Sequence, residues 1–232
     1  LPVHVEVDTG MSRHGVPAHE LGAFVQAIAA FQRSIVSGGS RYDRWLAGEP
    51  ALNAAELRGM ALFSSEKAEC FHCHGSFNFN NQTLHTASRL VETPFHNTGL
   101  YNIGGTGNFP EGNQGLFEFT AKATDRGLFR AASLRNIELT APYFHNGDSL
   151  TLEQVVEFYN RGGNHFQNNL ADVDPDIQPL GLTATEQKQL VAFMKALTDD
   201  RVRLKKAPFD KIKIDQSFVR GATEKGSCNG AI

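Results

Sequence analysis

The chain has 232 residues, of which 41% are hydrophobic and 20% charged, and its formal net charge is -3. This composition is typical of one or two folded globular domains and excludes disordered and fibrous classes. The small negative charge offers no basic surface for nucleic acid or an anionic membrane, and no apolar run is long enough to cross a bilayer. We therefore expect small molecules or proteins as partners.

The first predicted helix covers residues 21–35. Residues 1–18 show no sustained periodicity and are expected to be irregular. Apolar residues then recur at steps of three and four, and Gly38-Gly39 supplies a stop. The apolar face consists of Leu21, Phe24, Val25, Ile28, Phe31 and Ile35. Residues 40–48 are expected to form a short connector that ends in a turn at Gly48-Glu49-Pro50.

A second helix is predicted to lead into a pair of cysteines. Asn53 followed by Glu56 matches a capping box, in which each side chain bonds the backbone N–H of the other residue. The helix that opens here runs toward Cys70 and Cys73, which with His74 form the run C-F-H-C-H. The sequence therefore places a C-x-x-C-H motif at the end of a helical pattern.

C-x-x-C-H is the attachment motif of c-type haem, in which two thiols bind the porphyrin and the histidine binds iron. A zinc site would need four ligands, and no second C-x-x-C or H-x-x-x-H follows. A thioredoxin-like dithiol should begin a helix in a βαβ unit, and this motif does not. We predict that Cys70 and Cys73 attach one haem c and that His74 is the proximal ligand. His72 is expected to be solvated or to lie at the haem edge.

Haem c is attached outside the cytoplasm, so we expect a periplasmic location. The sequence starts at Leu1 without an initiator Met or a signal-peptide pattern, and we expect it to be processed or to lack upstream sequence. The third cysteine, Cys228, is left over near the C-terminus. Three cysteines are too few for a disulfide framework.

The part of the chain after the motif is predicted to combine long loops with two further helices. Residues 75–115 are rich in Asn, Gly, Thr and Phe, and a stretch of this length is expected to wrap a ligand, here the haem. Residues 139–147 are also irregular. Capping boxes that begin at Thr151 and Thr183 open the two helices. Because no alternating strand pattern precedes residue 205, the predicted fold class is all-α with long ordered loops.

Five segments in order along the chain carry a family resemblance. They are Ala27-Ile28-Ala29-Ala30-Phe31-Gln32-Arg33-Ser34, Cys70 to His74, Phe129-Arg130 with Ser133-Leu134-Arg135-Asn136, Thr140-Ala141-Pro142-Tyr143-Phe144-His145, and Phe158-Tyr159-Asn160-Arg161-Gly162-Gly163. In order and spacing they resemble the C-terminal half of the bacterial di-haem cytochrome c peroxidase and MauG-type family. The resemblance covers roughly residues 16–199 and implies a cytochrome c-like haem domain.

The resemblance implies a function in electron transfer. In the family, peroxide reacts at the haem of an N-terminal domain, and the haem of the C-terminal domain passes or stores electrons. This chain has one C-x-x-C-H, so the expected partners are an N-terminal haem domain with a second haem, hydrogen peroxide, and an electron-donor protein or a protein substrate. The peroxidatic residues are expected in the other half. The alternatives are a stand-alone mono-haem electron carrier and a haem-free zinc or structural module.

The resemblance also implies a second axial ligand on the helix after residue 151. Conventional peroxidases have Met at that position and MauG-type enzymes have Tyr, whereas this sequence has Tyr159. Tyr159 also lies in phase with the apolar face of its helix and could be an ordinary core aromatic. Met194 is an alternative ligand, although its position in the last helix is more typical of a core residue.

Four further residues receive expectations from the family. His145 is expected in the haem pocket, and Arg135 is expected to face a propionate or to form a buried ion pair. The backbone carbonyls of Thr140 and Pro142 match positions that help to bind calcium between the two haem domains, and carbonyl oxygens suit that cation.

We predict three parts of the chain. Residues 1–50 are a lead-in and a linking helix, residues 51–205 form the haem domain, and residues 206–232 form a tail of unassigned origin. In the tail, residues 207–221 alternate like a strand and look like a strand of the EAL-type cyclic-di-GMP phosphodiesterases. The metal-binding motifs of those enzymes are absent, so a foreign junction is expected and no function is assigned.

Overall fold

The computed structural model describes residues 7–8, 16–17, 21–82, 94–165 and 173–209. Helices dominate this part of the chain, and strands are few and short. In chain order the elements are β1 (Val7–Asp8), β2 (Val16–Pro17), α1 (Leu21–Ser34), α2 (Arg41–Leu46), α3 (Ala54–Phe63), α4 (Cys70–Cys73), β3 (Phe95–His96), α5 (Phe117–Thr120), η1 (Ala123–Asp125), β4 (Phe129–Arg130), η2 (Ile137–Leu139), α6 (Leu152–Asn160), α7 (Ala184–Ala196) and α8 (Asp200–Arg203).

Two pairs of two-residue strands depart from the predicted all-α fold. β1 pairs in parallel with β2, and β3 pairs antiparallel with β4, with Phe95 opposite Arg130 and His96 opposite Phe129. A strand of two residues has no room for an alternating pattern, so periodicity could not predict it. The described fold is therefore helix-dominated with a few short strands.

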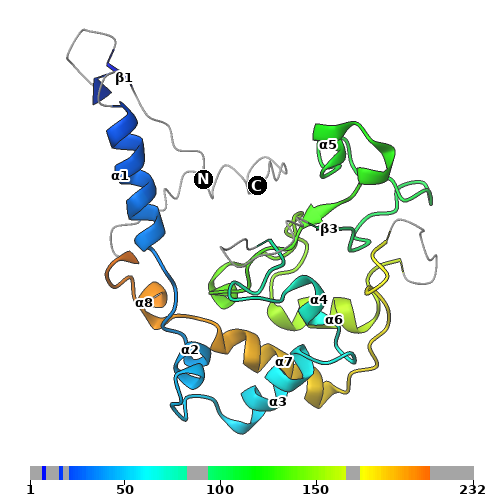
Figure 1. Cartoon of the computed structure of the whole chain (residues 1–232). Coiled ribbons are helices and arrows are strands. Elements are labelled where there is room, and N and C mark those ends of the chain that lie inside the picture. The colour runs from blue at the N-terminus through cyan, green and yellow to red at the C-terminus, as the bar shows by residue number, and fades with distance from the viewer. Residues whose placement is uncertain (1–6, 9–15, 18–20, 83–93, 166–172, 210–232) are drawn as a thin grey trace.

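Helices α3 and α7 pack against each other at the lower end of the molecule in Figure 1. A Cβ atom added to Gly59 would lie 1.9 Å from the main-chain oxygen of Gln189 and 2.9 Å from Cβ of Phe193. Only glycine therefore permits so close an approach of the two helices. The core around this crossing includes Phe63, Ala68, Phe79, Tyr143, Leu152, Val156, Leu182, Leu190, Val191, Phe193, Met194 and Leu197.

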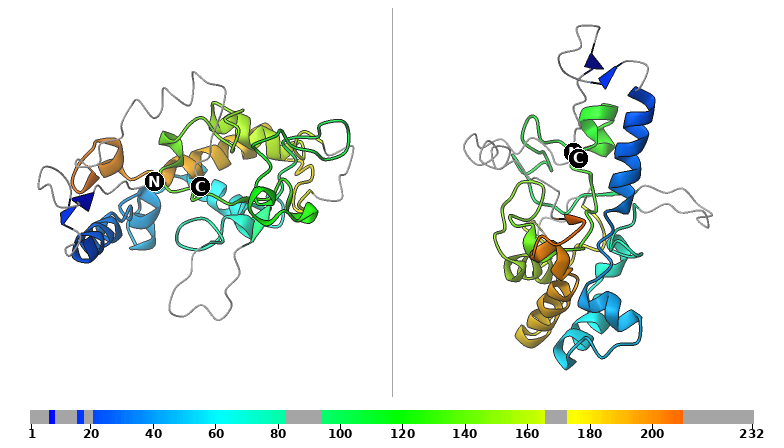
Figure 2. Two further views of the ribbon diagram at one scale, coloured as in Figure 1. Left: turned by 90° about the horizontal axis from the view of Figure 1, so that it is seen from above. Right: turned by 90° about the vertical axis from the view of Figure 1, so that its left-hand side faces the viewer.

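Helix α1 confirms the helix predicted from the apolar steps in that region, and it extends away from the helical core (Figures 1 and 2). None of its residues is buried. Phe24, Val25 and Phe31 of its apolar face are 41–48% exposed. The face that the sequence predicted is thus present but is not part of the core described above.

Helix α2 lies where the sequence analysis expected a connector. Its N-cap is Ser40, whose hydroxyl accepts from the backbone N–H of Asp43 at 3.2 Å, while the backbone N–H of Ser40 donates to the Asp43 carboxylate at 3.0 Å. The expectation of a connector was wrong because six residues are too few to show helical periodicity. The capping boxes predicted at Asn53, Thr151 and Thr183 are all confirmed.

Some of the expectations from the sequence concern residues outside the described part. Cys228 and most of the tail strand at 207–221 lie there, as do residues 83–93 of the predicted haem-wrapping loop. The three-part division of the chain remains a prediction. Among the described helices, none has the combined length and apolar character needed to cross a membrane.

Candidate haem site

The C-x-x-C-H motif forms a single helical turn, α4. The turn begins after its N-cap residue Glu69, whose φ of 55° lies in the left-handed region. Cys70 and Cys73 are three residues apart, a spacing that puts them on the same face of the turn, and both are free thiols. The backbone N–H of His74 closes the turn by donating to the carbonyl of Cys70 at 3.0 Å. Two sulfurs and an imidazole are thereby held on one short turn of backbone that runs from Cys70 to His74.

The imidazole of His74 is oriented by the chain that follows it. Its Nδ1 donates to the main-chain oxygen of Phe79 at 2.9 Å. Because Nδ1 carries the proton, Nε2 keeps a free lone pair, which is what an iron ligand needs. Burial lowers the pKa of His74, so the ring is neutral at pH 7. The tautomer and the charge both suit coordination.

Cys70 and Tyr159 border the same poorly solvated space as the motif. Burial raises the pKa of the Cys70 thiol to about 12. Burial also raises the pKa of Tyr159, and the nearby Cys73 and Cys70 sulfurs add to the rise. The phenol of Tyr159 is therefore buried and near enough to the two sulfurs for their charge to act on it. A tyrosinate at this place needs a cation beside it, and a haem iron would supply one.

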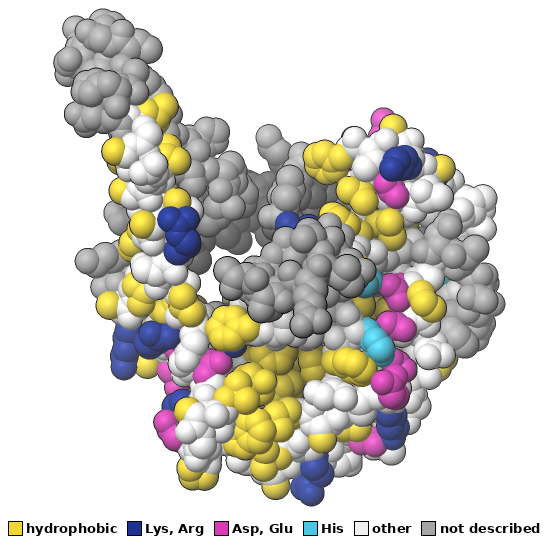
Figure 3. All heavy atoms as spheres, in the orientation of Figure 1, with side chains coloured by type: hydrophobic (Ala, Val, Ile, Leu, Met, Phe, Trp, Pro, Cys, Tyr) yellow, Lys and Arg dark blue, Asp and Glu magenta, His cyan; other side chains and the backbone are white. Residues whose placement is uncertain are grey.

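Together these side chains fit a c-type haem. Two free thiols lie on the turn that ends at the His74 imidazole, and the Tyr159 phenol is near enough to both sulfurs for them to raise its pKa. A hollow of about 310 Å³ borders His74 and is lined mainly by apolar side chains, among them Tyr42, Met60, Phe63, Phe71 and Phe79. Figure 3 shows hydrophobic side chains gathered on this face of the molecule.

Met194 lies in the hydrophobic core cluster, against which Cys70 also packs. It is 7% exposed and belongs to the same cluster as Leu190, Val191 and Leu197. This location favours the core role that its helical phase indicated. Tyr159 has Phe158 at 5.2 Å and Phe144 at 6.0 Å between ring centroids, so it also has aromatic neighbours.

His145 is half-buried in an aromatic cluster. Its ring stacks on that of Phe129, with 3.7 Å between the centroids and 8° between the planes. The ring centroids of Tyr101 and Phe109 lie 6.0 and 6.2 Å from that of His145. Its Nε2 is buried and has no hydrogen-bond partner among the described residues. Burial lowers the pKa of His145 to about 4. A buried nitrogen without a protein partner is costly, and it suits contact with a polar group of a bound ligand.

Arg135 is engaged in a buried ion pair. Its guanidinium donates twice to Asp43, at 3.0 Å each, and once to the carbonyl of Ser37 at 2.9 Å. Its Nε donates to the carbonyl of Phe77 at 2.8 Å, and the guanidinium lies 3.9 Å from the centroid of the Phe77 ring. These contacts tie α2 to the loop after the haem motif and favour the ion-pair alternative over a propionate contact.

Thr140 and Pro142 lie on the exposed loop that follows η2. The hydroxyl and the backbone N–H of Thr140 both donate to the carbonyl of Ile137, at 3.1 and 3.2 Å. Calcium binding at these two residues stays a prediction.

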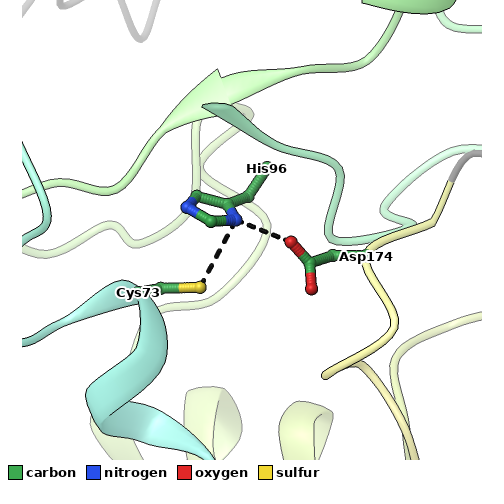
Figure 4. Close-up of side chains that lie close together, drawn as sticks. All are labelled: Cys73, His96 and Asp174. Carbon is green, nitrogen blue, oxygen red and sulfur yellow. Dashed lines mark hydrogen bonds and ion pairs between the residues drawn. The ribbon is translucent and has the colours of Figure 1, made fainter. Parts of the chain in front are cut away.

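The structure brings two residues to Cys73 that the sequence analysis missed. His96 Nδ1 lies 3.5 Å from Cys73 Sγ and donates to Asp174 Oδ2 at 2.6 Å (Figure 4). The three donor atoms lie within 4.8 Å of one another, a spacing that a metal ion could also use. Cys73 and His96 are 23 positions apart in the chain, and His96 and Asp174 are 78 positions apart, so no local pattern could have predicted the cluster.

His72, the residue between the two cysteines, faces the surface. Its Nε2 lies 2.9 Å from Glu69 and 3.6 Å from Glu66, and its side chain is 38% exposed. These three residues form an exposed ion-pair cluster, and such clusters are common without a metal ion.

Comparison with known proteins places the site in context. The cytochrome c peroxidase IdrP1 of Denitromonas iodatirespirans is 40% identical over 187 residues, which cover 74% of this chain and 48% of the relative. The methylamine utilization protein MauG of Methylorubrum extorquens is 33% identical over 172 residues, which cover 74% of this chain and 42% of the relative. The chain thus spans about half the length of the curated relatives it matches.

Among solved structures, a MauG-like protein associated with microbial copper homeostasis is 44% identical, with a TM-score of 0.76. The match covers 86% of this chain and 57% of that protein. A family model described as alanine racemase, N-terminal domain, matches residues 1–77, which is less than half of the chain. Within residues 1–77, the structure describes helices α1 to α4 and the strand pair β1–β2.

The fold, the motif and these relatives define a haem protein of the c type. The chain belongs to the bacterial di-haem cytochrome c peroxidase and MauG family.

Proposed function

We propose that this chain is the electron-transfer part of a di-haem oxidoreductase, with one haem c held by Cys70, Cys73 and His74. The observation that carries the proposal is the buried His74 imidazole at the end of the C-x-x-C-H turn, whose Nδ1 donates to the Phe79 carbonyl and whose neutral form therefore has its lone pair on Nε2. A haem bound there supplies one-electron chemistry at its iron. The chain supplies the tether, the orientation of the proximal ring and a poorly solvated surround.

The choice of the second ligand decides what the haem can do, and we propose Tyr159. A phenolate oxygen is a hard anionic donor that lowers the iron potential, whereas a thioether raises it. A low potential suits storage of oxidising equivalents, and a high potential suits a relay of electrons. The position of the Tyr159 phenol near Cys70 and Cys73, and of Met194 in the core, supports the first alternative.

We propose that electrons pass between this haem and a second, peroxide-reactive haem in another domain. The relatives named cytochrome c peroxidase support hydrogen peroxide as the acceptor and an electron-donor protein as the source, and the relative named MauG supports a protein substrate instead. A periplasmic location follows from covalent haem attachment. The carbonyls of Thr140 and Pro142 are the proposed calcium ligands on this side of the domain interface.

A zinc module remains the second candidate because the structure adds His96 and Asp174 to Cys73 as donors. Haem content separates the two. We expect the purified protein to show one covalently bound haem by its alkaline pyridine spectrum, to keep a haem stain after denaturation, and to contain no stoichiometric zinc. Bound zinc without haem would overturn the proposal.

The ligand assignment is tested by Tyr159→Phe with Tyr143→Phe as the matched control. Tyr143 is a buried tyrosine whose hydroxyl donates to the carbonyl of Ile137 at 3.0 Å, and the charged groups that act on its pKa are Glu138 and Glu153 rather than the cysteines. We expect the ferric absorbance spectrum to change in Tyr159→Phe and to stay as in the unsubstituted protein in Tyr143→Phe. If the ferric spectrum changed in Met194→Leu and not in Tyr159→Phe, the second ligand would be Met194 instead of Tyr159.

Peroxide turnover tests the proposal that this chain transfers electrons and that peroxide reacts at a haem in another domain. We expect this chain alone to show no peroxide turnover with a reduced electron donor, and turnover to require a second haem domain. Turnover by the isolated chain would contradict the proposed role and show that the peroxide-reactive haem is its own.

A further inference from the structure

Helix α2 carries two aromatic side chains that pack against each other. Tyr42 and Trp45 are three residues apart on this helix, a spacing that makes them neighbours on one face. Their rings stack with 6.3 Å between the centroids and 27° between the planes, which is within the range of packed aromatic pairs. Trp45 is the only tryptophan in the sequence.

Trp45 is the member of this pair that borders solvent. Its side chain is half-buried and lines a hollow of about 480 Å³, together with the exposed residues Glu49, Pro50 and Leu57. The neighbouring Leu46 is 59% exposed. The indole ring is therefore within reach of a protein that approaches α2 from outside.

Tyr42 is the member of the pair that borders the proposed haem site. Its ring centroid lies 5.1 Å from that of Phe79 and 5.8 Å from that of Phe193 in α7. Tyr42 also lines the hollow of about 310 Å³ that borders His74. Helix α2 therefore carries one ring at the surface hollow and the next ring at the hollow beside the proximal histidine.

Phe79 connects the two aromatic side chains to His74. Its ring packs edge-on against Tyr42, and its main-chain oxygen accepts from His74 Nδ1 at 2.9 Å. A series of ring contacts and one hydrogen bond thus runs from Trp45 to the imidazole that would bind iron. Because electron tunnelling weakens steeply with distance, a path of such short steps favours electron transfer along this line.

We propose that Trp45 is the point at which electrons from a protein partner enter this chain, and that Tyr42 and Phe79 bridge it to His74. This proposal rests on the proposed haem site and on the oxidising equivalent stored there, which is the oxidant. Trp45 passes one electron inward, keeps its N–H proton and regains an electron from the partner. The partner is thereby oxidised by one electron, the iron is reduced by one, and no bond forms or breaks.

Tyr42 is a bridge in this proposal and does not itself lose an electron. A phenol that loses an electron also loses its proton, which needs an acceptor. The carboxylate next to it in the chain, that of Asp43, already accepts from Arg135 and from the Ser40 hydroxyl. An indole can lose an electron and keep its proton, so the role of carrier falls to Trp45.

The test measures electron transfer within the holoprotein and does not use catalytic turnover. In a Cys228→Ser background, a ruthenium polypyridyl label is attached through Glu49→Cys, at the hollow that Trp45 lines, or through Glu66→Cys. Glu66 is the control position, because its side chain is 80% exposed and lies four residues before Cys70, away from α2 in the sequence. A flash with a soluble electron acceptor oxidises the label, and the absorbance of the reduced haem then reports the rate at which it gives an electron to the label.

Trp45→Phe should lower the rate from the label at residue 49 several-fold and leave the rate from the label at residue 66 unchanged. Phenylalanine keeps an aromatic ring for packing, but it does not give up an electron to the label. Tyr42→Phe is the matched variant on the same helix, and because it keeps the bridging ring we expect it to leave both rates close to those of the unsubstituted chain. A merely structural role of Trp45 would not distinguish the two label positions.

Two results would overturn the proposal: an unchanged rate from residue 49 in Trp45→Phe, or an equal loss of rate from both label positions. The second result would show that Trp45→Phe disturbs the haem and not a path to it. Failure of the proposed haem site is seen separately, because the pyridine spectrum of the unsubstituted protein would then show no covalent haem.

Discussion

The helical core and the loops around the haem motif are stabilised in different ways. Helices α3, α6 and α7 contain their own main-chain hydrogen bonds and each begins with a capping box. The loops after His74 depend on single bonds between distant segments, such as Ser133 Oγ to the Asn78 carbonyl at 2.7 Å and Arg135 Nε to the Phe77 carbonyl at 2.8 Å. One substitution should therefore cost more in the loop region than at a helix cap.

The largest effect is expected for Arg135→Ala. The Arg135 and Asp43 side chains are 6% and 11% exposed, so removing the arginine leaves a buried carboxylate unpaired, which costs about 3–5 kcal/mol. The free energy of unfolding in urea measures the loss. The control is Arg44→Ala, which breaks an exposed pair with Glu49 at 3.8 Å and should change stability by less than about 1 kcal/mol. Equal effects of the two variants would contradict the comparison.

Gly59→Ala tests the helix crossing. The added methyl would meet the main-chain oxygen of Gln189, so α3 and α7 must move apart at a cost of about 1–3 kcal/mol. Gly22→Ala is the control, because nothing lies within 4 Å of a Cβ atom at that position of α1. We expect Gly22→Ala to cause no loss of thermal stability, and a large loss there would show that α1 is more tightly packed than the structure has it.

The smallest effect is expected for Thr183→Ala. The variant removes the hydroxyl that accepts from the N–H of Glu186 at 3.3 Å and should lower the free energy of unfolding by about 1 kcal/mol. Thr183→Ser keeps the hydroxyl and should recover most of the loss. If Thr183→Ala cost as much as Arg135→Ala, the contrast between the two regions would not hold.

The same contrast explains what the sequence could predict. The apolar steps of α1, the three capping boxes and the haem motif are local patterns, and the structure has α1 and the capping boxes where they were expected. Helix α2 and the strand pairs were missed because each is too short for periodicity. The capping pattern of Ser40 and Asp43 is the one signal that could have indicated α2.

The environment of the motif was beyond sequence patterns. His96 and Asp174 reach Cys73 only through the folded loops, and no spacing rule connects them. Arg135 carried two expectations, and its bonds to Asp43 and to the Ser37 carbonyl depend on where α2 lies. The ligand roles of Tyr159 and Met194 stay predictions because they depend on the haem itself.

The hydrogen bond from His74 to Phe79 has a consequence for how this ring can vary. Its acceptor is a main-chain oxygen, which every amino acid carries, so no replacement of residue 79 alone deletes the acceptor. Only a change in the path of the chain can do so. Ser76 and Phe79 have φ values of 63° and 52°, so the path there runs through backbone angles that most residues avoid. Insertions and deletions in this short loop, rather than substitutions, are therefore the changes that could alter the orientation of the His74 ring.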